Sequence, residues 1–369
     1  MRVYLLVMAL AAVITYLLIP SVRAVARRTN ALTPLRDRDV HTEPTPRLGG
    51  IAMFLGFAAA LLIASRTTFL GEVFGISNQA WGILAAAGFI VALGVVDDIW
   101  DLDWITKFVG QVLAAGILVW QGVQLVTLPV FGLTIISSRM SLLITLFVVL
   151  VAINAVNFVD GLDGLASGMV AIGGSAFFVY SYLLTRSTET DYSDLSTMVV
   201  AALVGSCLGF LPHNFSPASI FMGDSGAMFL GLTVSAAGIV VTGNIDPGSS
   251  VEGLSTLTLP AYLPILLPVA VMLLPLLDLA FAVVRRVSAG KSPFTADGGH
   301  IHHRLLALGH SRRHAVVVMY LWTALFAFGT VGFAFLPVEM MVPLLAVAVV
   351  VALVSTLLPR LVGRRRHAR

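Results

Sequence analysis

Long apolar segments, separated by short polar ones, run through almost the whole chain. Each apolar segment is close to the ~20 residues that a helix needs to cross the hydrocarbon of a bilayer. No alternation of apolar and polar residues with a period of two suits a β-barrel. The pattern predicts eleven membrane-spanning helices, of which the fourth is the weakest. They lie at about 3–20, 48–65, 80–96, 106–121, 140–158, 165–185, 196–212, 226–243, 259–284, 315–335 and 340–359.

Composition agrees with a membrane protein. Hydrophobic residues make up 58% of the chain and charged residues 11%, and the mean hydropathy is +0.96, which excludes an ordinary soluble domain. The first segment is interpreted as an uncleaved span rather than a signal peptide, because its basic residues follow the apolar run. No internal repeat or low-complexity linker divides the chain. The sequence therefore predicts one domain, residues 1–369, folded as an all-α polytopic integral membrane helical bundle.

Lys and Arg residues predict the orientation. The loop at 21–47, Lys107, the loop at 285–314 and the tail from Arg360 together hold 18 of the 22 basic residues. By the positive-inside rule this side is cytoplasmic, so we expect the N-terminus outside and the C-terminus inside, in the cytoplasmic (inner) membrane. Basic loops beside lipid headgroups favour anionic lipid over nucleic acid as a partner. A homodimer suits a bundle of this size, but no residue demonstrates one.

Polar residues are gathered in four clusters, each next to an apolar segment. If successive segments alternate in direction, all four clusters lie on the cytoplasmic face. Carboxylates, amides and histidines are costly at a boundary between water and lipid, so by default they mark a functional site. The clusters are Asp97-Asp98-Ile99-Trp100-Asp101, the run from Asn154 to Gly164, Phe221-Met222-Gly223-Asp224-Ser225-Gly226, and His300-Ile301-His302-His303-Arg304.

The adjacent carboxylates Asp97 and Asp98 repel each other and need a cation or a proton beside them. A divalent cation is the simplest partner, and Lys107 follows nine residues after Asp98. The alternative is a solvated loop in which the two acids pair with nearby Arg residues.

The second cluster places Asn154, Asn157 and Asp160 at steps of three, on one broad face of a helix, and Asp163 extends the row. The alternative is that these side chains only join helices through hydrogen bonds. Asp224 precedes the eighth apolar segment, where a lone acid would be explained as a helix cap. Together the acids of the clusters form a set of hard oxygen ligands suited to Mg²⁺, with Mn²⁺ as the alternative.

The histidine cluster carries His300, His302 and His303. A zinc site is one interpretation, but no Cys accompanies these residues, and we favour hydrogen bonds to sugar or phosphate. Arg304 and Lys291 suit phosphate oxygens, Arg as a bidentate donor and Lys as a point charge.

These motifs, in this order, resemble the polyprenyl-phosphate N-acetylhexosamine-1-phosphate transferase family. The resemblance extends from His41 and the run Arg47-Leu48-Gly49-Gly50 to His303. The segment at 300–305 is more similar to the branch that transfers GlcNAc-1-phosphate than to the muramoyl-pentapeptide branch. Two positions depart from the family pattern: Asp39 stands where a basic residue is common, and Ala227 where Ser is common.

The resemblance implies an Mg²⁺- or Mn²⁺-dependent enzyme that transfers GlcNAc-1-phosphate from UDP-GlcNAc to a polyprenyl phosphate, undecaprenyl or decaprenyl phosphate, and releases UMP. This reaction would be the first membrane step in the synthesis of an envelope polysaccharide. The expected residues are as follows: catalytic Asp97, Asp98, Asp160 and Asp163; metal-binding Asp224, Asp160 and Asp163; substrate-binding Lys107, Asn154, Asn157, Asn214, Lys291, His300, His302, His303 and Arg304.

Three alternatives stay open. One is a phospho-N-acetylmuramoyl-pentapeptide transferase, and a more remote one is a secondary transporter, whose coupling residues should lie near the bilayer midplane. The third concerns mechanism: Asp97 assists direct attack by the lipid phosphate, or an acid acts as a covalent nucleophile. Asp278 is the one acid well inside an apolar segment. Pairing with Arg285 or Arg286 is the favoured interpretation, and the alternative is that it lines a groove for the lipid phosphate.

Overall fold

The computed structural model describes residues 1–33, 44–68, 70–129, 133–188, 191–243, 269–290 and 300–367. Helices dominate these residues, and the only sheet among them is an antiparallel pair in which Thr127 lies opposite Ile135. The elements are α1 (Arg2–Arg28), α2 (Gly49–Ala64), α3 (Gly71–Ile76), α4 (Gln79–Trp100), α5 (Trp104–Trp120), β1 (Thr127–Pro129), β2 (Leu133–Ile135), α6 (Ser138–Val159), α7 (Leu165–Thr188), α8 (Asp191–Asn214), α9 (Gly223–Gly243), α11 (Leu273–Ser288), α12 (Ile301–Ala307), α13 (Arg312–Phe335) and α14 (Val338–His367).

Eight of the described helices are long and apolar enough to cross a membrane, and α2 and α5 are shorter apolar helices. The prediction of a multi-pass helical membrane protein is therefore confirmed. The ninth predicted segment, 259–284, begins outside the described residues, and α11 covers its second half. The count of eleven spans and the orientation stay predictions.

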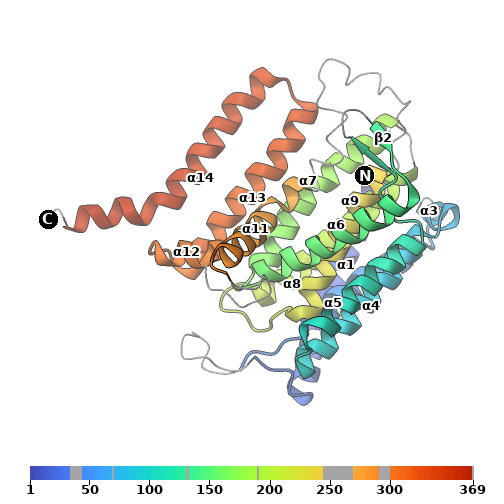
Figure 1. Cartoon of the computed structure of the whole chain (residues 1–369), viewed down its shortest axis with the longest axis horizontal. Helices are drawn as coiled ribbons and strands as arrows, with labels where there is room; N and C mark the ends of the chain where they lie inside the picture. The colour runs from blue at the N-terminus through green and yellow to red at the C-terminus, as the bar shows by residue number, and fades with distance from the viewer. Residues whose placement is uncertain are drawn as a thin grey trace.

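Helix α9 forms the centre of the bundle. Its most apolar 18-residue stretch is completely buried, and the helix packs against α2, α4, α6 and α8 (Figure 1). Glycine allows α9 to pack this closely against its neighbours: a Cβ at Gly231 would lie 2.5 Å from the Cα of Ile153 on α6. Helix α14 is the opposite case. It contacts α13 and stands away from the rest of the bundle (Figure 1), and only 11% of its most apolar 18-residue stretch is buried.

The turn between α4 and α5 returns the chain toward its own acidic end. Asp101 adopts a left-handed conformation, with φ of 54°, and ends α4. Asp103 then begins α5, because its Oδ2 accepts hydrogen bonds from the amides of Ile105 and Thr106 at 3.0 and 3.1 Å. Lys107, in the first turn of α5, is thereby brought back beside the end of α4.

Candidate active site

The loop before α9 is held by main-chain hydrogen bonds to the start of α2. The amide of Gly49 donates to the carbonyl of Phe221 at 3.0 Å, and the amide of Gly50 donates to the carbonyl of Met222 at 2.9 Å. A Cβ at Gly50 would lie 2.6 Å from the carbonyl carbon of Ser225. Only glycine therefore allows α2 to approach this loop so closely.

Asp98 caps the N-terminus of α9. Its Oδ1 accepts a hydrogen bond from the amide of Asp224 at 2.9 Å, and its Oδ2 accepts from the amide and the hydroxyl of Ser225 at 3.2 and 2.9 Å. Gly223 has a φ of +71°, and a Cβ there would lie 2.6 Å from Asp98 Oδ1. The carboxylate of Asp98 is thus used to place Asp224, and its charge is favourable at the positive end of the α9 dipole.

Asp97 has a different partner. Its Oδ1 accepts a hydrogen bond from the amide of Leu102 at 2.9 Å, and Lys107 Nζ lies 2.5 Å from its Oδ2. The same Nζ is 3.4 Å from Oδ2 of Asp224. Lys107 therefore bridges two carboxylates from helices that are far apart in sequence. The divalent cation expected beside Asp97 and Asp98 stays a prediction.

The row of polar residues on α6 divides into two functions. Asn157 Nδ2 donates a hydrogen bond to Oδ1 of Asp224, which joins the second and third clusters. Asn154 Nδ2 instead donates to Oε1 of Gln111 on α5 at 2.9 Å and to the carbonyl of Leu150 at 2.8 Å. These bonds favour a packing role for Asn154, and substrate binding by this residue stays a prediction.

Asp160 and Asp163 follow the end of α6. The pKa of Asp160 is raised to about 8, first by burial and then by the negative charges of Asp224, Asp98 and Asp163. Oδ2 of Asp163 accepts a hydrogen bond from the amide of Ala218 at 3.1 Å, in the loop between α8 and α9. Asp160 therefore lies in the combined negative field of the other acids.

The histidines lie beside this acidic loop. A Cβ on Gly161 would lie 2.5 Å from Nε2 of His302, so the ring of His302 rests against the loop after Asp160. Burial, together with the neighbouring His303 and His300, lowers the pKa of His302 to about 4. His303 and Arg304 are exposed on the same short helix, α12.

His300 is held by a residue of α11. Nδ1 of His300 lies 2.9 Å from Oδ2 of Asp278, and the amide of Ile301 donates to Oδ1 of the same carboxylate at 2.8 Å. The sequence did not predict the contact of Asp278 with His300; the expected pairing of Asp278 with Arg285 or Arg286 stays a prediction. A spacing of two helical turns drew attention to the Arg residues, whereas His300 lies on another element.

Asn214 is a further expected residue, and it forms hydrogen bonds with main-chain groups of two loops. Asn214 is 3% exposed, and its side chain joins two loops: Oδ1 accepts from the amide of Gly164 at 3.0 Å, and Nδ2 donates to the carbonyl of Ile220 at 3.0 Å. This favours positioning over direct contact with substrate, which stays untested for Asn214. Lys291 and His41 lie outside the described residues.

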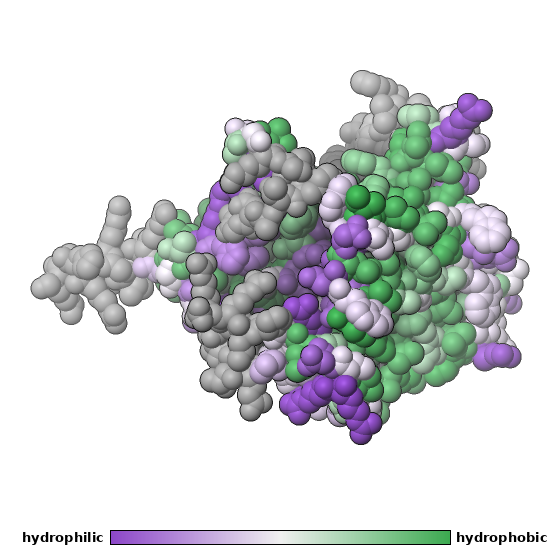
Figure 2. Space-filling view, turned by 60° about the horizontal axis from the view of Figure 1, so that its bottom comes forward, coloured by the Kyte–Doolittle hydropathy of each residue, from purple (hydrophilic) through white to green (hydrophobic). Residues whose placement is uncertain are grey.

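All four sequence clusters thus meet at one end of the bundle, as the alternation of the segments predicted. Figure 2 shows hydrophilic residues gathered near the middle of the view, beside a broad apolar side. Among the described residues, no three His, Cys, Asp or Glu side chains converge closely enough to enclose a metal. Mg²⁺ characteristically takes one or two protein carboxylates and completes its shell with water and substrate phosphates, and the oxygen donors present here fit that mode.

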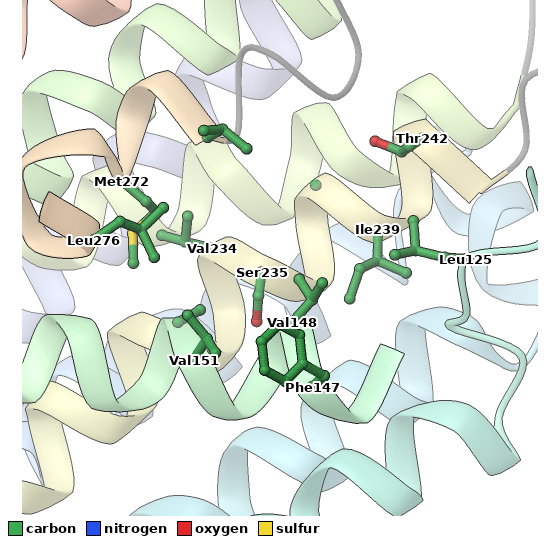
Figure 3. Close-up of a pocket in the computed structure, with 13 residues that line it drawn as sticks. Leu125, Phe147, Val148, Val151, Val234, Ser235, Ile239, Thr242, Met272 and Leu276 are labelled. Atoms are coloured by element: carbon green, nitrogen blue, oxygen red, sulfur yellow. The ribbon is translucent and has the colours of Figure 1, made fainter. Parts of the chain in front are cut away.

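An apolar cavity of about 230 Å³ lies between α6, α9 and the start of α11 (Figure 3). Val151 on α6, Ile239 on α9 and Leu276 on α11 are among the residues that line it. Phe147 and Val269, also in the lining, are 66% and 42% exposed, so the cavity opens to the outside of the bundle. Along α6, Ala152 in the cavity lining is about 12 Å from Asp160, at 1.5 Å per residue.

Comparison with known proteins agrees with this site. The model of glycosyl transferase family 4 matches residues 80–242, which hold the first three clusters. A decaprenyl-phosphate N-acetylglucosaminephosphotransferase of Mycolicibacterium smegmatis is 45% identical over 95% of this chain and 87% of that protein. The Mycobacterium tuberculosis protein of the same name is 43% identical over the same shares. A probable undecaprenyl-phosphate N-acetylglucosaminyl 1-phosphate transferase of Bacillus subtilis is 30% identical over 85% of this chain and 80% of that protein. The chain therefore belongs to the polyprenyl-phosphate N-acetylglucosamine-1-phosphate transferases of glycosyl transferase family 4.

Proposed function

We propose that the protein transfers GlcNAc-1-phosphate from UDP-GlcNAc to decaprenyl phosphate and releases UMP. The observation that carries this proposal is the convergence of Asp97, Asp224 and Lys107 at one end of a membrane bundle. Phosphoryl transfer needs charge neutralisation and in-line positioning, and this cluster offers carboxylates for a cation together with a cation for phosphate. The similarity to decaprenyl-phosphate transferases, at 42–45% identity, supports this acceptor.

The proposed chemistry is a direct displacement. An oxygen of the lipid phosphate attacks the β-phosphorus of UDP-GlcNAc, and the bond from that phosphorus to the bridging oxygen breaks as UMP leaves. Asp97 is the candidate to accept a proton from the lipid phosphate, because the neighbouring Lys107 favours its ionised form. The rival scheme uses an acid as a covalent nucleophile, and a phosphorylated enzyme trapped during a single turnover would distinguish the two.

Mg²⁺, or Mn²⁺ in its place, is proposed as the cofactor. Asp224, with Asp160 or Asp163, would hold it together with the pyrophosphate of the donor, where it neutralises negative charge. The high pKa of Asp160 supports this assignment, because buried carboxylates that repel one another are stabilised in their ionised form by a divalent cation. Asn157 positions Asp224 through its hydrogen bond, and Asp98 positions the same residue from the main-chain side.

The apolar cavity supports a lipid acceptor. Its lining is almost entirely hydrocarbon, and it opens to the outside of the bundle at the level of mid-α6. An isoprenoid tail in this cavity would leave its phosphate free to reach the carboxylates at the end of the same helix. Orientation follows from the positive-inside rule: we propose that the acid cluster faces the cytoplasm, where UDP-sugars are made.

The test follows the β-phosphate of the donor. Purified protein receives UDP-GlcNAc labelled at the β-phosphate, with decaprenyl phosphate and Mg²⁺. We expect label in the lipid phase and stoichiometric UMP, both lost in Asp224→Asn. Glu72→Gln is the matched control, because it also removes one negative charge but lies in α3, and it should transfer label as the wild type does. Label that stays in UDP-GlcNAc would overturn the proposal.

The same assay decides the alternative donor. UDP-N-acetylmuramoyl-pentapeptide replaces UDP-GlcNAc, and we expect no transfer. The relatives that match over nearly the whole chain carry the N-acetylglucosamine name, which disfavours the pentapeptide substrate.

A further inference from the structure

Asp278 is a buried acid that the chemistry above does not use. It lies in α11, it is 2% exposed, and it is remote in sequence from the four polar clusters. A carboxylate in such a place must have partners, because burying an uncompensated charge is expensive. Its two oxygens have separate partners at the start of α12, the imidazole of His300, which precedes the helix, and the amide of Ile301.

The two contacts fix different things. Ile301 is the first residue of α12, so the hydrogen bond from its amide sets where this helix begins, and a negative charge is favourable there. The contact with Nδ1 sets the ring of His300. An ionised carboxylate can only accept, so Nδ1 must carry the hydrogen, and Nε2 lies on the side of the ring away from Asp278.

The ring of His300 lies directly beside the acidic loop. Its centroid lies 5.5 Å from that of the Phe158 ring, and Phe158 precedes Asp160 by two residues. The guanidinium of Arg286 lies 5.2 Å from the centroid of the same Phe158 ring. On another side the ring of His302 runs parallel to it at 5.7 Å. His300 is thus enclosed by groups that fix its plane, while Asp278 fixes its tautomer.

We propose that Asp278 is a positioning residue for the transfer reaction: it holds His300 with its hydrogen on Nδ1 and so presents Nε2 to the phosphate or sugar groups of the donor. The inference rests on the proposed function, since it assigns His300 to the donor. At metal-bound histidines, a carboxylate behind the ring fixes its tautomer and orientation, and loss of that carboxylate typically costs about 10- to 100-fold in metal affinity or activity. We expect a similar cost for the loss of the Asp278 carboxylate.

The first test reads the tautomer itself. Protein labelled with ¹⁵N at its eight His residues is examined by NMR, and the signal of His300 is assigned by its absence in His300→Gln. We expect wild-type His300 to carry its hydrogen on Nδ1. In Asp278→Asn the side-chain oxygen can keep the Ile301 amide while its NH₂ faces the ring, so the hydrogen should move to Nε2. A wild-type His300 with its hydrogen on Nε2 would overturn the proposal, whatever the activity of the variants.

The second test is a double-mutant cycle on label transfer. Asp278→Asn should lower kcat/KM for UDP-GlcNAc by about 10- to 100-fold. In the His300→Ala background the same substitution should change it less than about threefold, because Asp278 acts through the ring that is already gone. If the role of Asp278 were purely structural, Asp278→Asn would instead lower kcat/KM by the same factor in the wild-type and the His300→Ala backgrounds. Asp103→Asn, at the start of α5, is the control, since Asn also serves as an N-cap and activity should not change.

The outcomes separate this inference from the proposed function. If wild type transfers no label, the proposed function fails, whereas the NMR result still reports on the Asp278–His300 contact. If wild type transfers label and Asp278→Asn moves the hydrogen yet keeps full kcat/KM, only the positioning role is overturned.

Discussion

The acidic end of the bundle and the histidine segment are built in different ways. At the acidic end, α2, α4 and α9 meet with almost no side chain between them, and main-chain amides hold the loop before Asp224. The histidine segment, α12, is attached through side chains: the carboxylate of Asp278, the stacked rings and Leu305, which packs into a small apolar cluster. Backbone contacts leave no room for adjustment, whereas side-chain contacts can shift. We therefore expect substitutions at the acidic end to cost more than those near the histidines.

The largest effect is expected at Lys107. Lys107→Met removes the cation between Asp97 and Asp224 and leaves a buried carboxylate without its counter-charge. We expect label transfer to fall at least about 100-fold. The free energy of unfolding should drop by about 1–3 kcal/mol, less than for a fully buried ion pair because the Lys side chain is 28% exposed. Lys107→Arg keeps the charge and should recover much of the stability; a Met variant as active as wild type would contradict this role.

Gly94 tests the backbone contact directly. A Cβ at this position of α4 would lie 2.5 Å from the amide nitrogen of Ser225 and 2.9 Å from the carbonyl carbon of Asp224. Because these neighbours are backbone, Gly94→Ala should cost about 1–3 kcal/mol and reduce activity by displacing Asp224. The matched control is Gly116→Ala on α5, where nothing lies within 4 Å of the added methyl group. Equal melting temperatures for the two variants would show that the contact is looser than described.

The apolar cavity should affect only long acceptors. Val151→Trp fills part of it, and we expect KM for decaprenyl phosphate to rise about tenfold, which corresponds to ~1.4 kcal/mol. With dimethylallyl phosphate, whose single isoprene unit is too short to reach the cavity from the acidic end, the change should be small. Leu143→Trp lies on the exposed face of the same helix and serves as control. A similar loss with both acceptors would mean that the substitution disturbs the site instead of the tail.

The smallest effect concerns His302. Because its pKa in the folded protein is about 4, below the ordinary value of 6.5, the folded state binds fewer protons than the unfolded state between these values. The contribution of His302 to stability is therefore complete above pH 6.5 and is lost as the pH falls toward 4. ¹⁵N NMR of the imidazole should show a neutral ring down to about pH 5. A midpoint near 6.5 would mean that α12 leaves this ring in water.

The sequence predicts the helices of this bundle well and their contacts poorly. Apolar length suffices to locate the segments, but α9 and α14 are both strongly apolar, and only packing shows that one is central and the other exposed. The adjacency of Asp97 and Asp98 predicted a divalent cation, which stays a prediction, whereas the observed neighbour of Asp97 is Lys107. That Asp98 instead caps a helix begun 125 residues later could not be predicted, because a cap across the fold leaves no local pattern.

Asp278 shows the same limit from the other direction. Local spacing pointed to Arg285 and Arg286, since residues on one helix are the neighbours that a sequence reveals. His300, which contacts Asp278, follows a segment outside the described residues, so no helical periodicity connects the two. The signal that could have found it is chemical: a buried carboxylate and a histidine-rich run at the same end of the bundle.

The outward opening of the apolar cavity has a kinetic consequence for the proposed reaction. Its lipid substrate would arrive by lateral diffusion in two dimensions, while the nucleotide sugar arrives from water. The rate then depends on the mole fraction of acceptor in the surrounding amphiphile and not on its amount per litre. Adding detergent at constant acceptor should slow the enzyme by surface dilution, and restoring the ratio should restore the rate.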